Sequence, residues 1–298
     1  MKIEVAIPCF NEEATVAKVI GDFKKALAGA DVTVYDNNST DRTAELARQA
    51  GARVVSVSSR GKGNVVKEIF ESTEADVVVM ADGDDTYEAE DAKLLIEPVL
   101  KGEADMVIGT RLHSENSQFR KLHLFGNRIL TVTLNMLFGT DYKDILSGYR
   151  AFSRRFMKDV PLIGTGFEIE SEFMIQALEN GMAVREVPIR FRKRPGNSKS
   201  KLSTFGDGYR IMLTIVSMLR DHRPLFLFSL LALANVVLGC SIWAVGFVNI
   251  TKSYWFYMLK RAGIYLVAAS FALFLVGLIL NTVNVRMREI TSLLKRRK

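Results

Sequence analysis

The sequence contains only two cysteines among its 298 residues. It also lacks features that are typical of secreted proteins and of nucleotidyltransferases. Cys9 lies in a charged region and Cys240 in an apolar one, and neither has metal-ligand spacing, so neither a disulfide framework nor a cysteine metal site is expected. The segment after Met1 is too short for a secretory signal peptide. A glycine-rich phosphate loop is also absent, because Ile7–Asn11 reads IPCFN, and this argues against a nucleotidyltransferase.

Charge is missing from two long stretches near the C-terminus. Residues 225–248 and 263–285 contain no Asp, Glu, Lys or Arg. A helix rises about 1.5 Å per residue, so roughly 20 residues cross a hydrocarbon core about 30 Å thick. Two buried core helices are the alternative, but soluble helices of this length seldom lack every charge. We therefore predict two transmembrane helices that anchor the chain, with no charged residue to form a transport pathway.

The net charge of +7 does not favour nucleic-acid binding, because the cations gather beside the apolar stretches. Residues 286–298 carry six cations and one acid, whereas the intervening 249–262 carries three cations. The positive-inside rule then places the N-terminal domain and the C-terminus in the cytosol, in a multi-pass protein of the plasma (inner) membrane. The expected parts are a cytosolic domain (1–203), an interface helix (204–223), the two spans (224–285) and a basic tail (286–298).

The first half of the chain alternates short β-branched runs with stretches of helical spacing. Such alternation is typical of an α/β fold with a mostly parallel sheet, in which ligands bind beyond the carboxyl ends of the strands. Polar residues follow five expected strands, which predicts one shared crevice. The expected strands are 3–7, 32–35, 53–57, 77–80 and 106–108; the helices are 12–27, 40–50, 64–72 and 89–100; the polar segments are 8–13, 36–43, 59–63, 82–85 and 110–111.

Two carboxylates, Asp82 and Asp84, follow the apolar run VVVMA. Two acids two residues apart at a strand end can reach one hard cation, and Mg²⁺ favours one or two carboxylates together with substrate phosphate oxygens. The alternative is a solvated acidic turn. The position after a buried strand favours the metal site.

The polar segment 36–43 has two compatible interpretations. Ser39 or Thr40 fits the cap of the following helix. The same loop also offers donors and acceptors to a base and ribose. The next loop, Gly61–Gly63, brings Lys62 within reach of a phosphate or base.

Cations also gather at 190–201, just ahead of the apolar region. They attract either anionic lipid headgroups or the phosphate of an acceptor. The segments 119–138 and 205–219 are amphipathic, as core-facing helices or as helices at the membrane surface, and the surface is favoured for the second. The cations of the cluster are Arg190, Arg192, Lys193, Arg194, Lys199 and Lys201.

Taken in order, these motifs resemble those of family 2 glycosyltransferases with the GT-A fold. Two later segments, DILSGYR at 144–150 and RKRPGNSK at 192–199, are similar to the polyprenyl-phosphate branch, which includes dolichol-phosphate mannose synthase and undecaprenyl-phosphate sugar transferases. The resemblance covers residues 3–220, and the two-helix hairpin fits it. The earlier motifs are VAIPCFNE at 5–12, DNNSTDRT at 36–43, GKG at 61–63, DGD at 82–84 and GTR at 109–111.

The resemblance implies a role for each set of residues. Asp82 and Asp84 would hold Mg²⁺ or Mn²⁺. Thr86 stands where relatives often place a polar metal-side residue such as Gln, so the third protein ligand stays open. Asp84 and Asp144 are the catalytic candidates, and Asp144 acts either as a base or by orienting an arginine or the donor sugar. The nucleotide-sugar would contact Pro8, Asn11, Glu12, Asp36, Asn38, Lys62 and Asp82. The acceptor phosphate would contact Arg111, Arg120, Lys121, Arg128, Arg192, Arg194, Ser198 and Lys199.

Together, these expectations predict an inverting glycosyltransferase that acts in cell-envelope glycan synthesis. It would move a sugar from a nucleotide-sugar, UDP- favoured over GDP-linked, to a polyprenyl phosphate at the cytosolic membrane face. A phosphate monoester is largely dianionic at pH 7 and needs little general base. A diacylglycerol-type acceptor and a non-catalytic membrane scaffold are the alternatives; the basic cluster argues against the first and the intact acidic pair against the second. Whether the chain forms a homo-oligomer stays open.

Overall fold

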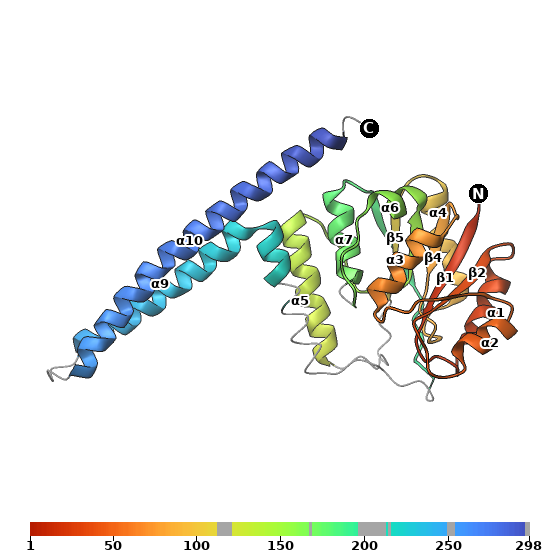
Figure 1. The fold of residues 1–298 in the computed structure, drawn as a ribbon, viewed down its shortest axis with the longest axis horizontal. Helices are drawn as coiled ribbons and strands as arrows, with labels where there is room; N and C mark the ends of the chain where they lie inside the picture. Colours follow the sequence, from red (N-terminus) through yellow and green to blue (C-terminus); the bar gives the residue numbers. More distant parts are fainter. Residues whose placement is uncertain (112–120, 167–168, 196–212, 214–215, 249–253, 296–298) are drawn as a thin grey trace. The chain divides into compact units, whose positions relative to one another are not determined.

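The computed structural model describes residues 1–111, 121–166, 169–195, 213, 216–248 and 254–295 (Figure 1). The chain divides into two compact units, Met1–Gly208 and Tyr209–Lys298.

The first unit is built on a seven-stranded sheet of order β3-β2-β1-β4-β6-β5-β7. Every pairing is parallel except those of β6, which is antiparallel to both β4 and β5. The expected α/β fold is thus confirmed, with five strands close to their expected positions and two that the sequence pattern did not indicate. The strands are β1 Ile3–Cys9, β2 Asp31–Asp36, β3 Arg53–Ser56, β4 Val77–Met80, β5 Met106–Arg111, β6 Arg150–Ser153 and β7 Val184–Ile189.

Apolar side chains cover both faces of this sheet. Val5, Ile7 and Val79 belong to a core with α1 and α4. Because successive side chains of a strand point to opposite faces, Phe152 lies on the other face, where its ring packs against Phe173. The helices around the sheet (Figure 1) are α1 Val16–Ala26, α2 Thr43–Gln49, α3 Lys62–Ser72, η1 Ala89–Asp91, α4 Ala92–Leu100, α5 Lys121–Phe138, α6 Arg154–Asp159 and α7 Ile169–Glu179.

Two helix starts differ from expectation for local reasons. Helix α1 begins at Val16 rather than residue 12, because Thr15 has a φ of −126°, which lies outside the helical region. Helix α2 begins at Thr43, and the expected cap at Ser39 or Thr40 is wrong. The Asp41 carboxylate instead accepts the Thr43 backbone N–H at 3.0 Å, and this local turn delays the helix.

The second unit contains two long apolar helices, α9 Pro224–Val248 and α10 Tyr254–Lys295. Residues 224–246 and 254–287 are long and apolar enough to cross a membrane. The expected loop over 249–262 is wrong from Tyr254 onward, and the basic tail is helical as far as Lys295. From Tyr254 to Ala262 the sequence has neither Gly nor Pro, so nothing in it stops a helix from starting before the uncharged stretch.

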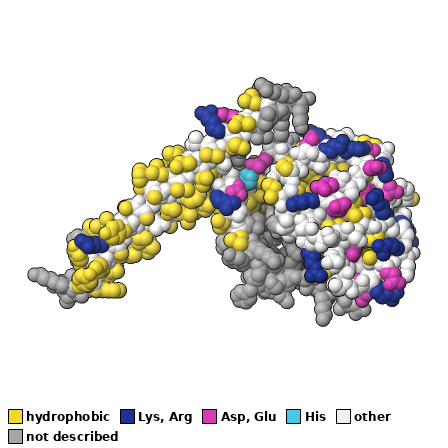
Figure 2. Space-filling view, viewed as in Figure 1, with side chains coloured by type: hydrophobic (Ala, Val, Ile, Leu, Met, Phe, Trp, Pro, Cys, Tyr) yellow, Lys and Arg dark blue, Asp and Glu magenta, His cyan; other side chains and the backbone are white. Residues whose placement is uncertain are grey.

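Small residues allow α9 and α10 to pack closely. A Cβ on Gly239 would lie 2.7 Å from the carbonyl oxygen of Gly263, and a Cβ on Gly263 would lie 2.6 Å from that of Gly239. Such close backbone approach is typical of helix pairs in membranes. Figure 2 shows hydrophobic side chains over most of the visible surface of the two helices. Leu233, Val237 and Phe271 are among the exposed apolar side chains of this unit.

Candidate active site

The carboxyl ends of β1 and β2 are tied together by side chains of their loops. Asn11 donates its backbone N–H to Ser39 Oγ at 2.9 Å and accepts the Thr40 N–H on Oδ1 at 2.8 Å. The Glu12 N–H donates to Thr43 Oγ1 at 2.8 Å. Asn11 and Glu12, both expected to line a nucleotide site, therefore fix the shape of this edge.

Asp36, at the end of β2, offers a buried acceptor. Its Oδ2 accepts the Ser39 N–H at 3.3 Å, but its buried Oδ1 has no hydrogen-bond partner among the described residues. Leaving a buried carboxylate oxygen without a donor costs about 1–3 kcal/mol or more, so such an atom is well suited to a ligand N–H.

Asn37 was not expected at the site, yet it anchors the next loop. Its Nδ2 donates to the Ser59 carbonyl at 2.8 Å and its Oδ1 accepts the Gly61 N–H at 2.8 Å. Asn38, which was expected, is exposed, with a φ of 59°. The amide of Asn37 thereby sets the position of the loop that carries Lys62.

Lys62 lies between two carboxylates at the carboxyl ends of the strands. Its Nζ is 2.7 Å from Asp82 Oδ1 and 2.8 Å from Glu170 Oε1. Burial alone would lower the pKa of Lys62, but the two carboxylates outweigh burial and raise that pKa above its ordinary value, so the ammonium stays charged. Glu170, from α7, was missed because nothing in its local sequence places it beside a lysine more than a hundred residues earlier.

Gly148 packs against the Lys62–Asp82 pair. A Cβ at this position would lie 2.7 Å from Asp82 Oδ2 and 3.0 Å from Lys62 Nζ. The backbone here is also fixed, since the Gly148 N–H donates to the Tyr87 hydroxyl at 3.0 Å. Absence of a side chain at residue 148 is thus a condition for the geometry of the pair.

Gly148→Ala should lower kcat/KM about ten- to a hundredfold with little change in thermal midpoint, because displacing the pair by a fraction of an ångström misplaces the substrate. The atoms that must move are the ends of flexible side chains rather than backbone. Gly21→Ala is the matched control, because a Cβ there meets nothing within 4 Å. Steady-state kinetics with thermal melts test this, and full activity of Gly148→Ala would show that the pair does not touch the substrate.

Asp84 lies two residues after Asp82 in the loop that follows β4. Each of its two carboxylate oxygens accepts hydrogen bonds. Its Oδ1 accepts the Thr86 hydroxyl at 2.6 Å and the Thr86 N–H at 3.2 Å. Its Oδ2 accepts Arg194 Nε at 3.1 Å, and Arg194 Nη2 also donates to it. Among the described residues no group of three or more His, Cys, Asp or Glu side chains could hold a metal ion. Two neighbouring carboxylates fit Mg²⁺ or Mn²⁺ when substrate phosphate oxygens complete the shell.

Three alternate residues of the segment after β7 pair with carboxylates in residues 84–91, which we call the acidic loop. We call these three residues, Arg190, Arg192 and Arg194, the arginine ladder. Arg190 Nη2 lies 2.7 Å from Asp91 Oδ1, Arg192 makes a two-nitrogen contact with Glu88, and Arg194 contacts Asp84. A backbone hydrogen bond also connects the two segments, since the Arg192 N–H donates to the Thr86 carbonyl at 2.7 Å. Of the expected acceptor-phosphate residues in the ladder, Arg194 thus pairs with Asp84 of the candidate site, whereas Arg192 pairs with Glu88.

Arg111 and Asp144 form a second pair at the end of β5. Arg111 Nε is 2.6 Å from Asp144 Oδ2 and Nη2 is 2.8 Å from Oδ1, while Asn127 Nδ2 donates to Oδ1 at 3.1 Å. Burial alone would raise the pKa of the Asp144 carboxyl, but the hydrogen bonds and charge of Arg111 outweigh it and lower that pKa. Asp144 is therefore ionised at neutral pH and holds the guanidinium in one orientation.

Of the remaining expected acceptor residues, the structure describes the side chain of Arg128 alone. Arg128, on α5, is exposed. Arg120, Ser198 and Lys199 lie outside the described residues, and so does the side chain of Lys121.

A buried arginine, Arg150, was not expected at the site, and it holds two segments of the site together. Arg150 is fully buried, and its Nη2 donates to the carbonyls of Ile145 at 2.6 Å and Glu170 at 2.9 Å. Burial lowers the pKa of Arg150 to about 10, so it stays charged at neutral pH. It links the loop before β6 to the start of α7 and so fixes Gly148 and Glu170 relative to each other.

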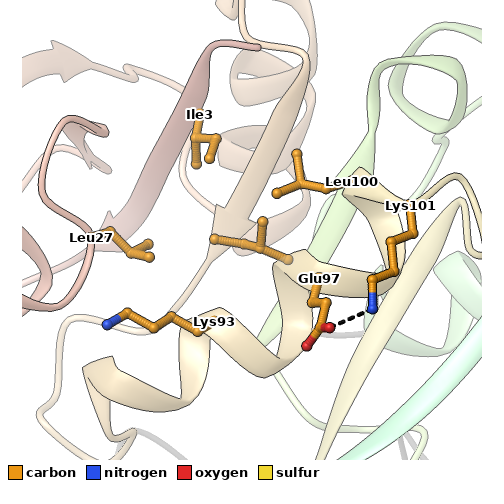
Figure 3. A pocket seen from close by; sticks show the side chains of 7 residues that line it. Ile3, Leu27, Lys93, Glu97, Leu100 and Lys101 are labelled. Carbon is orange, nitrogen blue, oxygen red and sulfur yellow. Dashed lines mark hydrogen bonds and ion pairs between the residues drawn. The ribbon is translucent and has the colours of Figure 1, made fainter.

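A separate hollow of about 330 Å³ lies at the other end of β1 (Figure 3). It is lined by apolar side chains and by the aliphatic stems of charged residues. Two of these charged residues, Glu97 and Lys101, form an ion pair. The hollow offers no converging donors for a phosphate, so the charged side chains at the carboxyl ends of the strands form the candidate site. The hollow is lined by Ile3, Leu27, Lys93, Ile96, Glu97, Leu100 and Lys101.

Comparison with known proteins gives a consistent result. The model of glycosyl transferase family 2 matches residues 4–160. The chain is 38% identical over 240 residues to Glycosyltransferase AglJ of Haloferax volcanii, covering 80% of this chain and 78% of that protein. It is 30% identical over 222 residues to a dolichyl-phosphate hexose transferase of the same organism, covering 74% and 95%.

A solved structure with a similar fold is glucosyl-3-phosphoglycerate synthase from Mycobacterium tuberculosis, in complex with Mn²⁺, UDP-glucose and phosphoglyceric acid. The TM-score is 0.62 at 28% identity, over 72% of this chain and 79% of that one. The findings confirm the resemblance inferred from the sequence motifs and the GT-A-like fold that it implies.

Proposed function

Because the chain belongs to glycosyl transferase family 2, we propose that it transfers a sugar from a nucleoside-diphosphate donor to a polyprenyl phosphate at the cytosolic face of the membrane. The observation that carries this proposal is the group of charged side chains at the carboxyl ends of the strands. Lys62, Asp82 and Asp84 meet there beside two arginines, Arg111 and Arg194, each already oriented by a carboxylate. A diphosphate leaving group and a phosphate acceptor need such a mixture of charges.

The donor half of the site is assigned to the ends of β1–β4. Asp36 Oδ1, which has no hydrogen-bond partner in the described part of the chain, suits an N–H of the base, and Lys62 suits a phosphate oxygen. A UDP-sugar is favoured over a GDP-sugar, with support from the UDP-glucose bound by the similar synthase structure. Pro8 and Glu12 line the same edge of the sheet.

Asp82 and Asp84 would hold a divalent cation, Mg²⁺ or Mn²⁺. When bound, such an ion neutralises charge that develops on a leaving diphosphate. The similar synthase structure contains Mn²⁺, which supports this assignment.

Transfer then follows as a single in-line displacement. An oxygen of the acceptor phosphate attacks the anomeric carbon, the bond from that carbon to the diphosphate oxygen breaks, and the configuration inverts. The acceptor is largely a dianion at pH 7, so no side chain has to remove a proton from it. Arg111, held by Asp144, and Arg194 would orient that phosphate.

Helix α5 supports a lipid acceptor. Asn127 on this helix contacts Asp144, whereas the exposed Ile129, Val132 and Met136 form an apolar stripe. A helix that reaches the active site on one side and exposes apolar residues on another is suited to a membrane surface. A diacylglycerol acceptor would not require the arginines, and a non-catalytic scaffold would not require the acidic pair.

The direct test is incubation of membranes containing the full chain with a panel of radiolabelled UDP- and GDP-sugars. We expect one UDP-sugar to label a lipid only when polyprenyl phosphate is added, and the label to be released by mild acid. Membranes containing Asp84→Asn are the control. Label in diacylglycerol, or equal labelling without polyprenyl phosphate, would refute the proposed acceptor.

The proposed orientation is tested by cysteine labelling from outside the cell. Cys240 is exposed on α9 and must first be replaced, whereas Cys9 is buried. A cysteine at Lys252 should react with an impermeant maleimide on intact cells, and one at Leu293 should react only after permeabilisation, because the basic residues after 285 stay inside. The reverse pattern would place the catalytic unit outside and remove its access to cytosolic donors.

A further inference from the structure

The last member of the arginine ladder differs from the other two in its partner. Arg190 pairs with Asp91, and Arg192 pairs with Glu88 and lies 3.4 Å from Asp85, so neither occupies a carboxylate of the candidate metal pair. Arg194 instead takes Oδ2 of Asp84, whose other oxygen is held by Thr86. One carboxylate therefore serves both an arginine assigned to the acceptor and the proposed metal site.

The way in which Arg194 can leave Asp84 is restricted. A guanidinium does not lose its proton in proteins, so a change of pH near neutrality cannot release it. It can be displaced by another cation that takes the carboxylate. The Arg192 N–H to the Thr86 carbonyl and the Arg190 N–H to Asp91 Oδ2, both 2.7 Å, hold the chain beside the acidic loop, so the Arg194 side chain alone has to turn.

We propose that Arg194 and the divalent cation compete for Asp84, and that binding of the cation makes Arg194 available to the acceptor phosphate. The proposal rests on the function proposed above for this site. This competition would couple binding of the donor to binding of the acceptor, because the guanidinium of Arg194 can contact the acceptor phosphate only after the cation has bound to Asp84. By linkage, the acceptor phosphate must then strengthen cation binding by the same factor.

The competition is measurable without any reaction. Mn²⁺ binding to the purified full chain in detergent, followed by water-proton relaxation without nucleotide, should be about tenfold tighter in Arg194→Ala than in the wild type, since a charge-assisted hydrogen bond no longer competes. Arg194→Lys should fall between them and guards against misfolding of the alanine variant. Arg185→Ala is the matched control, because it removes an arginine of β7 that pairs with Glu103 at 2.6 Å on the surface. Unchanged or weaker Mn²⁺ binding in Arg194→Ala overturns the competition.

The coupling is measured with farnesyl phosphate as the probe. Its affinity for the wild type should rise about tenfold when Mn²⁺ and UDP are added, and Arg194→Ala should lose this rise while Arg185→Ala keeps it. Equal affinity with and without Mn²⁺ and UDP in the wild type overturns the coupling. Failure to bind farnesyl phosphate under every condition would refute the proposed acceptor, whereas the Mn²⁺ comparison decides the competition independently.

Discussion

Asp84→Asn should reduce sugar transfer by at least about a hundredfold, because stabilisation of the leaving diphosphate by a bound cation is worth several kcal/mol. The substitution is nearly isosteric. The amide oxygen of Asn can still accept from Thr86, so the loop should keep its shape, and what is lost is the charge facing the cation and Arg194. Initial rates with saturating donor and acceptor, together with Mn²⁺ binding by water-proton relaxation, measure the effect.

Asp91→Asn separates this effect from mere loss of an arginine–aspartate pair. Asp91 is also buried and pairs with the neighbouring Arg190, but it is not part of the proposed metal pair. We expect Asp91→Asn to lower the thermal midpoint while Mn²⁺ binding is kept. Turnover of Asp84→Asn near the wild-type rate, or full wild-type activity in excess EDTA, would contradict the role of Asp84.

The strand-end residues were predictable because their positions follow from topology alone. Once the β/α alternation is recognised, parallel strands must present their carboxyl ends at one edge. Lys62 and Asp82 therefore meet although they lie 20 residues apart, and the structure adds the 2.7 Å distance between Lys62 Nζ and Asp82 Oδ1.

The residues that were missed depend on packing that no local pattern carries. Strand β6 is a four-residue strand inserted antiparallel between β4 and β5, and no local pattern indicates that its Arg150 is buried. Its burial follows from carbonyls supplied by α7 and by the loop before β6. Glu170 was missed for the same reason, because only that packing brings it to Lys62.

The basic cluster shows a different limit of sequence reasoning. Six cations within twelve residues indicate a strong positive field, but not which anions satisfy it. In the structure, Arg190, Arg192 and Arg194 face carboxylates about a hundred residues earlier, and this pairing depends on β7 lying at the end of the sheet. Charge density alone could not distinguish a lipid surface from this internal partner.

Asp144→Asn should lower kcat/KM for the acceptor by about a hundredfold, comparable with the loss of a charge-assisted contact to the phosphate. The physical reason is loss of orientation of Arg111, which is held by two hydrogen bonds of 2.6 and 2.8 Å. A general base works best with a pKa near the operating pH, and the pKa of Asp144 is lowered instead. Glu103→Gln, at the surface pair with Arg185, is the matched control and should change nothing.

The pH dependence should follow the acceptor rather than Asp144. A folded-state pKa below the unfolded value means that the pair stabilises the protein above about pH 3.9, and that this contribution is lost as the pH falls through the lower folded value. Asp144 therefore stays ionised between pH 5 and 8. The acid limb of the rate profile should lie near the second pKa of the phosphate, about 6, in the wild type and in Asp144→Asn alike.

A double-mutant cycle separates orientation from base catalysis. If Asp144 acts through Arg111, then Arg111→Ala and Asp144→Asn remove the same interaction, and the double variant should be no slower than Arg111→Ala alone. If Asp144 were a base, its removal would slow Arg111→Ala by a further factor, since proton transfer by a positioned side chain contributes about a hundredfold or more. Thermal melts accompany the kinetics, because each single change leaves a partner buried without its counter-charge and should lower stability by about 3–5 kcal/mol. Additive losses in kcat/KM would assign Asp144 to proton transfer and contradict the orienting role that its contacts with Arg111 and Asn127 indicate.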